Sequence, residues 1–311
     1  MKKNIFNKYF VVYNPTASGF KNENLKLVLD KIEDKTNIIA SALKSTYRGS
    51  VLDIIKTVDS EDSLIITLGG DGTVSEAYEA YHQNGQKGTY AHIPTGTTND
   101  MAKNYNVIKN KPDEIISDIL DGEVSLFDTY SLNGKASAYC SVFGYLAHVP
   151  YVTNTSLKKH LGHAAYVLSA GKYLMKKPVK YNISYETENM KGNGDFILGA
   201  VSNSNGFAGI DLFKDAKLDD GKVELLLVKN LTPGVILSLI KDYLKNDVDL
   251  KRYSKYLIMD QASNIELKFN DKLLEFPVDM DGENSNISPR YIDDSLTFKV
   301  ENPLRIMTRK K

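Results

Sequence analysis

Three glycine-bearing turns, each placed after a short apolar run, constrain the fold of this chain more than any other feature. The turns are Asn14–Gly19, Gly69–Thr73 and Pro94–Asp100. Glycine lets the backbone take positive φ values and approach a ligand closely, and a helix that follows such a turn directs free N–H groups toward it. If the apolar runs are parallel strands of one sheet, the turns meet at its carboxyl edge and form a phosphate cradle. The sequence therefore predicts a phosphotransferase.

The N-terminal half has the pattern of an α/β domain. Strand-like and helix-like stretches alternate as far as about Asp128, with strands expected at 9–13, 37–43, 64–68 and 90–93 and helices at 22–33, 49–58 and 74–83. Strands that alternate with helices favour parallel pairing, with helices on both faces of the sheet. We predict an N-terminal α/β nucleotide-binding domain with a parallel sheet over residues 1–130.

The second half has a different pattern. Short strand-like runs separated by Asn, Gly and Asp turns are typical of an antiparallel sandwich, and they occur at 136–144, 179–187, 196–203, 222–229, 264–269 and 295–300. Helices are expected at 157–175 and 232–244. The predicted fold class is thus α/β plus all-β, with a C-terminal antiparallel β-sandwich over 131–311. We expect its last residues to pack back on the N-terminal domain, and the ligand site to lie in the cleft between the domains.

Composition limits the partners that the chain can have. It carries 39 basic and 39 acidic residues, so its formal net charge is zero and bulk attraction to nucleic acid is not indicated. Its single cysteine, Cys140, excludes an internal disulfide and a multi-cysteine metal site and fits a reducing cytosol. We expect neither a signal peptide nor a spanning helix, because no window approaches the roughly 20 apolar residues that a span needs. The expected location is the cytoplasm.

The turn around Asp71 carries the most informative chemistry. A carboxylate placed among groups suited to phosphate is repelled unless a cation lies between them. Mg²⁺ binds through one or two carboxylates together with substrate phosphates and resolves the conflict. Thr73 can donate to a phosphate oxygen, as can Gly96 and Thr97 in the third turn, where capping of the next helix explains Asn99 and Asp100. The alternative, an ordinary tight turn with a solvated aspartate, is weakened by the two companion turns.

Two polar loops in the second half are candidate catalytic and metal sites. Asp281 and Glu283 are separated by one flexible glycine, so both carboxylates can face one point and deprotonate an attacking hydroxyl; an isolated solvated turn is the alternative. The segment 215–222 is not an EF-hand, because Lys217 occupies an acidic position. One carboxylate with two carbonyls there suits Mg²⁺, and a plain hairpin turn explains the loop equally well.

The stretch Leu157–Lys177 carries lysines at both ends of an apolar centre. A basic amphipathic helix of this kind can lie on an anionic lipid surface. A solvated helix face accounts for the pattern equally well.

Taken together and in this order, these motifs resemble those of the soluble bacterial diacylglycerol kinase and related lipid kinase family, over nearly the whole chain. The motifs that carry the resemblance are Asn14-Pro15 with Ser18-Gly19, Gly69–Thr73, Pro94–Asp100, Asp215–Gly221 and Asp281-Gly282-Glu283. The resemblance implies a kinase that uses ATP and Mg²⁺, with diacylglycerol as the expected acceptor and phosphatidic acid as the product. It also implies a peripheral enzyme at the inner membrane face.

The resemblance also implies roles for individual residues. Glu283 resembles the family's proton acceptor with Asp281 as its partner, Asp71 the carboxylate that holds the catalytic metal through water, and Asp128 a supporting acid. Lys217, Asp220 and Lys222 match a structural Mg²⁺ loop, the two lysines through their carbonyls. The implied nucleotide contacts are Asn14, Pro15, Thr16, Ser18, Gly19, Thr46, Gly70, Asp71, Gly72, Thr73, Glu76, Gly96 and Thr97.

Two other kinds of protein remain open at this point. One is an NAD kinase or another small-molecule kinase, since the Gly-Gly-Asp-Gly element occurs there too. The other is a non-catalytic nucleotide sensor that has kept the turns and lost the chemistry, although the intact Asp71, Asp281 and Glu283 argue against it. The acceptor lipid, its acyl chains and the oligomeric state, a homodimer included, are left open by the sequence.

Overall fold

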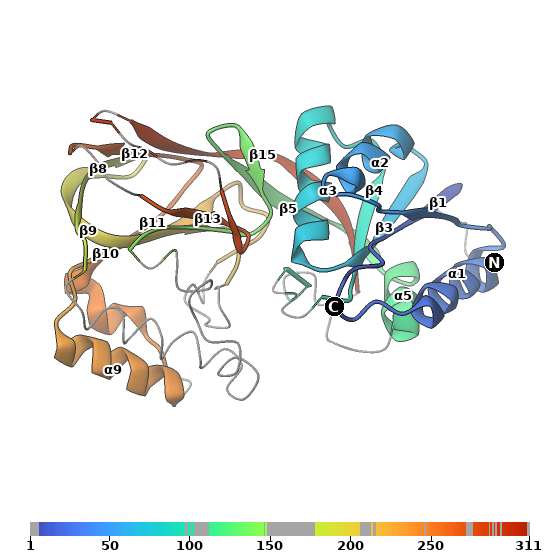
Figure 1. The fold of residues 1–311 in the computed structure, drawn as a ribbon, viewed down its shortest axis with the longest axis horizontal. Coiled ribbons are helices and arrows are strands. Elements are labelled where there is room, and N and C mark those ends of the chain that lie inside the picture. The colour runs from blue at the N-terminus through green and yellow to red at the C-terminus, as the bar shows by residue number, and fades with distance from the viewer. Residues whose placement is uncertain are drawn as a thin grey trace. The chain divides into compact units, whose positions relative to one another are not determined.

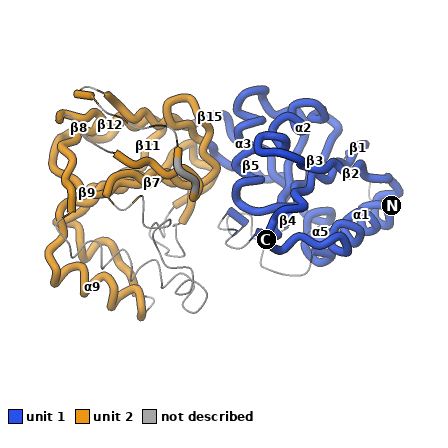
Figure 2. Tube along the Cα trace, in the orientation of Figure 1, with its two compact units in different colours: residues 1–129, 301–311 blue, residues 130–300 orange. Residues whose placement is uncertain are grey.

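The computed structural model describes residues 6–96, 99, 101–102, 112–145, 147, 178–205, 213, 216–245, 247–271, 276–285, 287, 289, 291–292 and 294–309. The chain divides into two compact units (Figure 2). Unit 1 comprises residues 1–129 and 301–311, and unit 2 comprises residues 130–300. Within the described part of the chain, no helix is long and apolar enough to cross a membrane.

Unit 1 is built on parallel strands in the order β2–β1–β3–β4–β15; Figure 1 labels β1, β3 and β4, and Figure 2 also labels β2. Their bounds are β1 Lys8–Tyr13, β2 Ser41–Lys44, β3 Ser63–Gly69, β4 Thr89–Pro94 and the end of β15, Ser295–Thr308. Every residue of β3 is buried, as expected for a central strand that helices cover on both faces.

In the described part of unit 1, helices pack in pairs against this sheet. They are α1 Asn22–Thr36 with α5 Pro112–Leu120, and α2 Ser50–Val58 with α3 Asp71–Asn84. Val28 of α1 and Ile116 of α5 share a buried cluster with Leu64 and Ile66 of β3. Against the other face, Tyr78 and Tyr81 of α3 make edge contacts with Tyr90 of β4. Unit 1 is therefore a three-layer α/β/α structure.

Unit 2 consists mainly of antiparallel strands. The other strands that the structure describes are β5 Glu123–Leu132, β6 Lys135–Ser137, β7 Cys140–Gly144, β8 Tyr181–Thr187, β9 Lys191–Ser202, β10 Val223–Lys229, β11 Leu257–Ala262, β12 Asn264–Phe269, β13 Val278–Met280 and β14 Glu283–Asn284. The first half of β9 pairs with β8, and its second half pairs with β7 on one side and β10 on the other. The strand β9 thereby joins β8 to β7 and β10, and these strands surround a common core.

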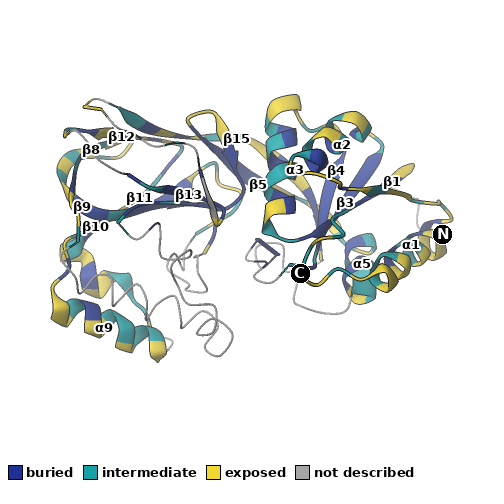
Figure 3. Ribbon diagram, viewed as in Figure 1, coloured by how far each residue is buried: buried dark blue, intermediate teal, exposed yellow. Residues whose placement is uncertain are grey.

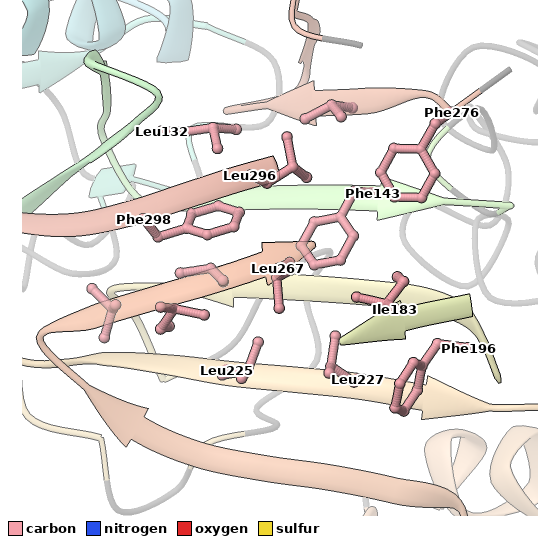
Figure 4. Packing of buried hydrophobic residues seen from close by; sticks show 14 of the residues in the cluster. Leu132, Phe143, Ile183, Phe196, Leu225, Leu227, Leu267, Phe276, Leu296 and Phe298 are labelled. Carbon is pink, nitrogen blue, oxygen red and sulfur yellow. The ribbon is translucent and has the colours of Figure 1, made fainter. Parts of the chain in front are cut away.

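That core follows from the alternation along the strands. In β12 the residues Ile265, Leu267 and Phe269 are buried and their neighbours are exposed. They pack with Phe298 of β15 and Phe143 of β7 in a cluster to which nine of the described strands contribute, and Figure 4 shows part of it. Alternating burial of this kind is what antiparallel sheets with one wet face require.

Among its described residues, unit 2 also contains two helical elements. The helix α9, Pro233–Leu244, begins where the Thr232 hydroxyl accepts a hydrogen bond from the Val235 N–H, with proline at its first position. The 3-10 helix η1, Leu250–Tyr256, follows it. Both pack on the face of β10 and β11 that carries Leu226, Val228 and Leu257.

The predicted fold class, α/β plus antiparallel β, is confirmed. The sequence patterns did not predict α5, β5, β11 or η1, and they predicted that β15 ends at 300 although it continues to Thr308. The predicted helix 157–175 lies outside the described residues.

Candidate functional site

The three glycine-bearing turns lie at one edge of the sheet of unit 1 and bond directly to one another. They follow β1, β3 and β4, which are parallel neighbours, so all three stand at the carboxyl ends. The Thr95 N–H donates to the Gly69 carbonyl at 2.6 Å, and the Gly19 N–H donates to the Thr95 carbonyl at 2.8 Å. The edge is therefore one continuous structure of backbone groups.

Glycine is required where these turns touch. A Cβ atom on Gly96 would lie 2.6 Å from the Gly70 Cα, and one on Gly19 would lie 2.8 Å from the Thr95 carbonyl oxygen. Both distances are shorter than any tolerable contact with a Cβ. The turns can approach one another this closely only because these positions have no side chain.

Polar side chains fix the shape of the first and third turns. The Asn14 Oδ1 accepts from the Thr16 N–H at 2.9 Å and from its hydroxyl at 2.7 Å. In the third turn the Asn99 side chain accepts from the Gly96 N–H at 2.9 Å and donates to the Gly96 carbonyl at 2.6 Å. Asn99 has a φ of 50°, so it closes the turn through its side chain instead of acting as an extended cap residue.

Asp71 connects the second turn to the third. It is the first residue of α3, which places its half-buried carboxylate at the positive end of a 14-residue helix. Its Oδ1 accepts a hydrogen bond from the Met101 N–H at 3.3 Å. The side chain of Thr73, by contrast, is buried and packs over Gly69. A contact between Thr73 and phosphate stays a prediction.

Thr46 reaches the same edge by way of β2. The Ser45 N–H donates to the Tyr13 carbonyl at 2.9 Å, which ties the end of β2 to the start of the first turn. Thr46 is exposed there, and its N–H donates to the Ser50 hydroxyl at 3.1 Å. The position that the family resemblance implied therefore lies beside the first turn.

Glu76 has a structural role in this region. Its carboxylate accepts from the Gly49 N–H at 2.8 Å and from the Val51 N–H at 3.1 Å. A carboxylate at the start of α2 satisfies donors that would otherwise lack partners and complements the helix dipole. Glu76 thus fastens α2 to α3; its predicted contact with a nucleotide stays a prediction.

The edge also contains a polar atom that sequence reasoning missed. The hydroxyl of Thr95 is buried and has no hydrogen-bond partner among the residues that the structure describes. A buried hydroxyl without a partner is unfavourable by about 1–3 kcal/mol. Thr95 carries two of the backbone bonds that join the turns, so this hydroxyl lies within the cradle itself. In the sequence, only the position of Thr95 between Pro94 and Gly96 indicated that it belongs to the third turn.

In unit 2, Asp281 is a buried anchor. Its carboxylate accepts four hydrogen bonds, from the Ser137 hydroxyl at 3.0 Å and from the N–H groups of Ala138, Tyr139 and Cys140 at 2.7, 3.0 and 3.2 Å. Burial raises the pKa of Asp281, and the donated hydrogen bonds oppose that rise. The aspartate therefore holds the connection between β6 and β7.

The same residue opens the turn that carries Glu283. Asp281 and Gly282 have φ values of 55° and 85° and join Met280 to its partner Glu283 across the β13–β14 hairpin. Positive φ at both central positions is the geometry that Asp-Gly favours in two-residue hairpins. The Gly282 N–H donates to the Asp279 carboxylate at 2.9 Å. The backbone at Glu283 is thus fixed, while its side chain lies outside what the structure describes.

The structure also describes the other predicted acid, Asp128, and the predicted metal ligands Lys217, Asp220 and Lys222. Asp128 is buried in β5. Lys217, Asp220 and Lys222 are exposed, and the Asp220 Oδ1 accepts from the Lys222 N–H at 3.2 Å in a turn completed by Gly221 at a φ of 72°. Among the described residues there is no group of three or more His, Cys, Asp or Glu side chains that could hold a metal ion. The carbonyl-based magnesium loop stays a prediction.

The structure does not test two parts of the sequence prediction: the convergence of the predicted acids and the roles of several predicted residues. Asp71 belongs to unit 1, whereas Asp281 and Glu283 belong to unit 2, so their convergence stays a prediction. Thr97, Asp100 and Asp215 lie outside the described residues, as does the basic stretch 157–177.

Comparison with known proteins adds a second line of evidence. The profile of the family described as "Diacylglycerol kinase catalytic domain" matches residues 8–132. The chain is 30% identical over 227 residues to a diacylglycerol kinase of Staphylococcus saprophyticus, covering 70% of this chain and 72% of that protein. It is 25% identical over 284 residues to the diacylglycerol kinase of Bacillus subtilis, covering 90% of each.

Solved structures agree in fold. A crystal structure of a diacylglycerol kinase from Bacillus anthracis str. Sterne superposes with a TM-score of 0.76 at 19% identity, over 99% of this chain and 98% of that one. Another crystal structure from the same organism gives a TM-score of 0.82 at 21% identity, over 99% and 97% of the two chains. The likeness extends over both units.

Proposed function

The chain belongs to the diacylglycerol kinase family, and on that premise we propose that it transfers the γ-phosphoryl group of ATP to the free hydroxyl of a diacylglycerol, giving phosphatidic acid for phospholipid metabolism. Membership of this family makes it an enzyme of the kinase class. The observation that carries the proposal is the edge of unit 1, where Gly19, Gly70 and Gly96 let three turns meet at the start of α3.

That edge suits a triphosphate. Backbone N–H groups at a helix N-terminus attract anions, and the glycines let the three turns close together at the start of α3. The Thr95 hydroxyl, which has no hydrogen-bond partner among the described residues, is a further donor at the same edge. We assign nucleotide binding to the three turns and to Thr46.

Two groups of residues, one at Asp71 and one in the loop 217–222, suit Mg²⁺. Mg²⁺ prefers carboxylate and carbonyl oxygens. Asp71 supplies a half-buried carboxylate among phosphate-binding groups, and Asp220 supplies an exposed carboxylate in a turn with the carbonyls of Lys217 and Lys222. Asp71 would hold the ion that neutralises phosphate charge, with Asp128 in support, and the loop 217–222 would hold a structural ion.

The chemical step follows from positioning and charge. Glu283 accepts the proton of the lipid hydroxyl as its oxygen forms a bond to the γ-phosphorus, and the bond from that phosphorus to the bridging oxygen breaks to release ADP. Asp281 takes no part in proton transfer in this scheme. Its four hydrogen bonds hold in place the hairpin that carries Glu283.

An acceptor screen tests the proposal. Purified protein is incubated with γ-labelled ATP, MgCl₂ and, in separate reactions, dioleoylglycerol in detergent micelles, phosphatidylglycerol, sphingosine or NAD. We expect label in phosphatidic acid, and we expect EDTA to abolish it. Preferential labelling of NAD would assign the chain to the other kinase class, and no labelled product with any acceptor would favour the nucleotide sensor.

A further inference from the structure

The helix α9 has an outward face that its packing does not explain. Its inward residues, Ile236 among them, pack in a buried cluster on β10 and β11. Leu237 and Leu244, however, are 56% and 62% exposed. They lie seven residues apart, which is two helical turns, so they share one side of the helix. Figure 3 shows exposed positions recurring along α9.

Lysines accompany the two leucines. Lys241 lies one turn after Leu237, and Lys245 follows Leu244; both are exposed. Within the part of the chain that the structure describes, neither lysine forms an ion pair. The outward face therefore combines apolar side chains with positive charge.

The nearby acidic residues Asp242 and Asp247 bond to residues of η1, away from the side of α9 that carries the two leucines. The Asp242 carboxylate accepts from the Tyr253 hydroxyl at 2.7 Å and pairs with Arg252 at 3.4 Å. Arg252 also pairs with Asp247 at 3.0 Å. These bonds tie η1 to α9 on the Asp242 side of the helix and use the carboxylates there, so no acidic group of α9 stands on the leucine side.

We propose that α9 docks on the surface of an anionic lipid bilayer, with Leu237 and Leu244 entering the boundary between headgroups and acyl chains and with Lys241 and Lys245 meeting lipid phosphates. Charge complementarity identifies the occupant, because exposed leucines flanked by lysines match a negatively charged interface. Lysine stems can lie along the apolar surface while their ammonium groups stay in water. The inference rests on the proposed function in one respect: a diacylglycerol acceptor resides in the membrane.

Vesicle sedimentation tests the docking surface without reference to catalysis. The probe is sucrose-loaded vesicles of phosphatidylcholine with phosphatidylglycerol, at low salt. We expect the Leu237→Gln/Leu244→Gln variant to lose on the order of tenfold in partitioning, and Lys241→Gln/Lys245→Gln to lose its dependence on phosphatidylglycerol content. A matched control, Leu27→Gln/Ile39→Gln, alters two exposed apolar residues of unit 1 (46% and 79% exposed) and is expected to sediment like the wild type.

A second readout separates this inference from the proposed function. The leucine variant is expected to phosphorylate a short-chain, monomeric diacylglycerol at the wild-type rate and to lose activity on vesicle-embedded diacylglycerol. If the wild type phosphorylates neither acceptor, the proposed function fails, while sedimentation still decides the docking surface.

Three results would overturn the inference. The first is wild-type sedimentation of the leucine variant. The second is loss of vesicle binding only on Lys172→Gln/Lys176→Gln, in the basic stretch 157–177. The third is a change in the sedimentation coefficient of the leucine variant without lipid, which would make this face a contact between copies of the chain.

Discussion

Asp281 is a carboxylate whose surroundings define its role. It is 5% exposed and accepts hydrogen bonds from four donors in the segment 137–140. The Ser137 hydroxyl is also hydrogen-bonded to the Tyr130 hydroxyl at 2.8 Å, and Tyr130 is buried as well. A group engaged on both oxygens is suited to holding backbone in place.

The exchange Asp281→Asn tests that role. An amide has one acceptor oxygen and presents N–H groups to a site made of donors, so we expect a loss of about 2 kcal/mol in the free energy of unfolding. Urea denaturation measures it, with the exposed Asp219→Asn as a control in the same unit. An unchanged midpoint for Asp281→Asn would contradict the structural role.

His92 makes stability depend on pH. It is buried in β4, and its Nδ1 hydrogen-bonds the Thr67 hydroxyl at 2.8 Å. Burial lowers the pKa of His92 from 6.5 to about 3. The folded state therefore keeps the imidazole neutral while the unfolded state protonates it, so stability is full above about pH 6.5 and decreases as the pH falls toward 3.

The size of that dependence is predictable. Each pH unit below 6.5 should remove up to about 1.4 kcal/mol. Denaturation of the wild type and of His92→Asn between pH 7.5 and 5 gives the comparison, since asparagine keeps a polar group near Thr67 but does not titrate. Equal slopes for the two proteins would show that other groups cause the effect.

At the scale of elements, α2 is positioned by a residue of α3. The two oxygens of Glu76 accept from the N–H groups of Gly49 and Val51 at the start of α2, and Gly49 lies three residues after Thr46. The glutamate thus links a helix pair to the predicted nucleotide site.

Replacing Glu76 with glutamine should weaken this link. The amide keeps one acceptor and faces the second N–H with a donor, so we expect a loss of about 1 kcal/mol in the free energy of unfolding. We also expect a higher KM for ATP with little change in kcat, because the segment 45–50 loses a support. Glu61→Gln, at an exposed position, is the control; a fall in kcat at unchanged KM would contradict this assignment.

The elements that the sequence predicted well are those with one dominant signal. The alternation of β12 and the largely apolar run of β3 were sufficient, since each pattern has one physical explanation. By contrast, β5 begins with the exposed Val124 and Leu126 and continues into buried residues, so its pattern changes midway. The end of β15 was missed because Pro303 indicates a break, although proline is tolerated where its missing N–H is not needed.

The site residues, too, include some that the sequence made predictable and some that it did not. The turn glycines were predictable because close backbone approach demands that residue type. The partners of Asp281 and Glu76 were not, because Ser137 is 144 residues away from Asp281 and Gly49 is 27 away from Glu76. Such contacts are fixed by tertiary structure and leave no local pattern.

At the scale of the whole molecule, the chain passes between the two units in β5 and again in β15. The last residues of β15 return to unit 1, where Ile306 pairs with Tyr90 of β4 and Met307 joins the buried cluster of α1 and α5. The C-terminus is therefore part of the α/β unit.

Deleting residues 301–311 should destabilise unit 1. The deletion removes buried Leu304, Ile306 and Met307 and exposes the edge of β4, so we expect a loss of at least about 3 kcal/mol. Hydrogen exchange of β3 and β4 amides reports on unit 1, and amides of β8 and β12 report on unit 2. Removing 310–311 alone is the control; unchanged protection of β3 and β4 after the longer deletion would contradict the expectation.

Replacing Asp71 tests the claim that the glycine-lined edge of unit 1 is the site of phosphoryl transfer. Label transfer from γ-labelled ATP to diacylglycerol is measured for the wild type, Asp71→Asn and the exposed control Asp34→Asn, each with its urea midpoint. We predict that kcat falls at least about a hundredfold in Asp71→Asn, with its midpoint near the wild-type value, and stays unchanged in Asp34→Asn. Full activity in Asp71→Asn would contradict the claim.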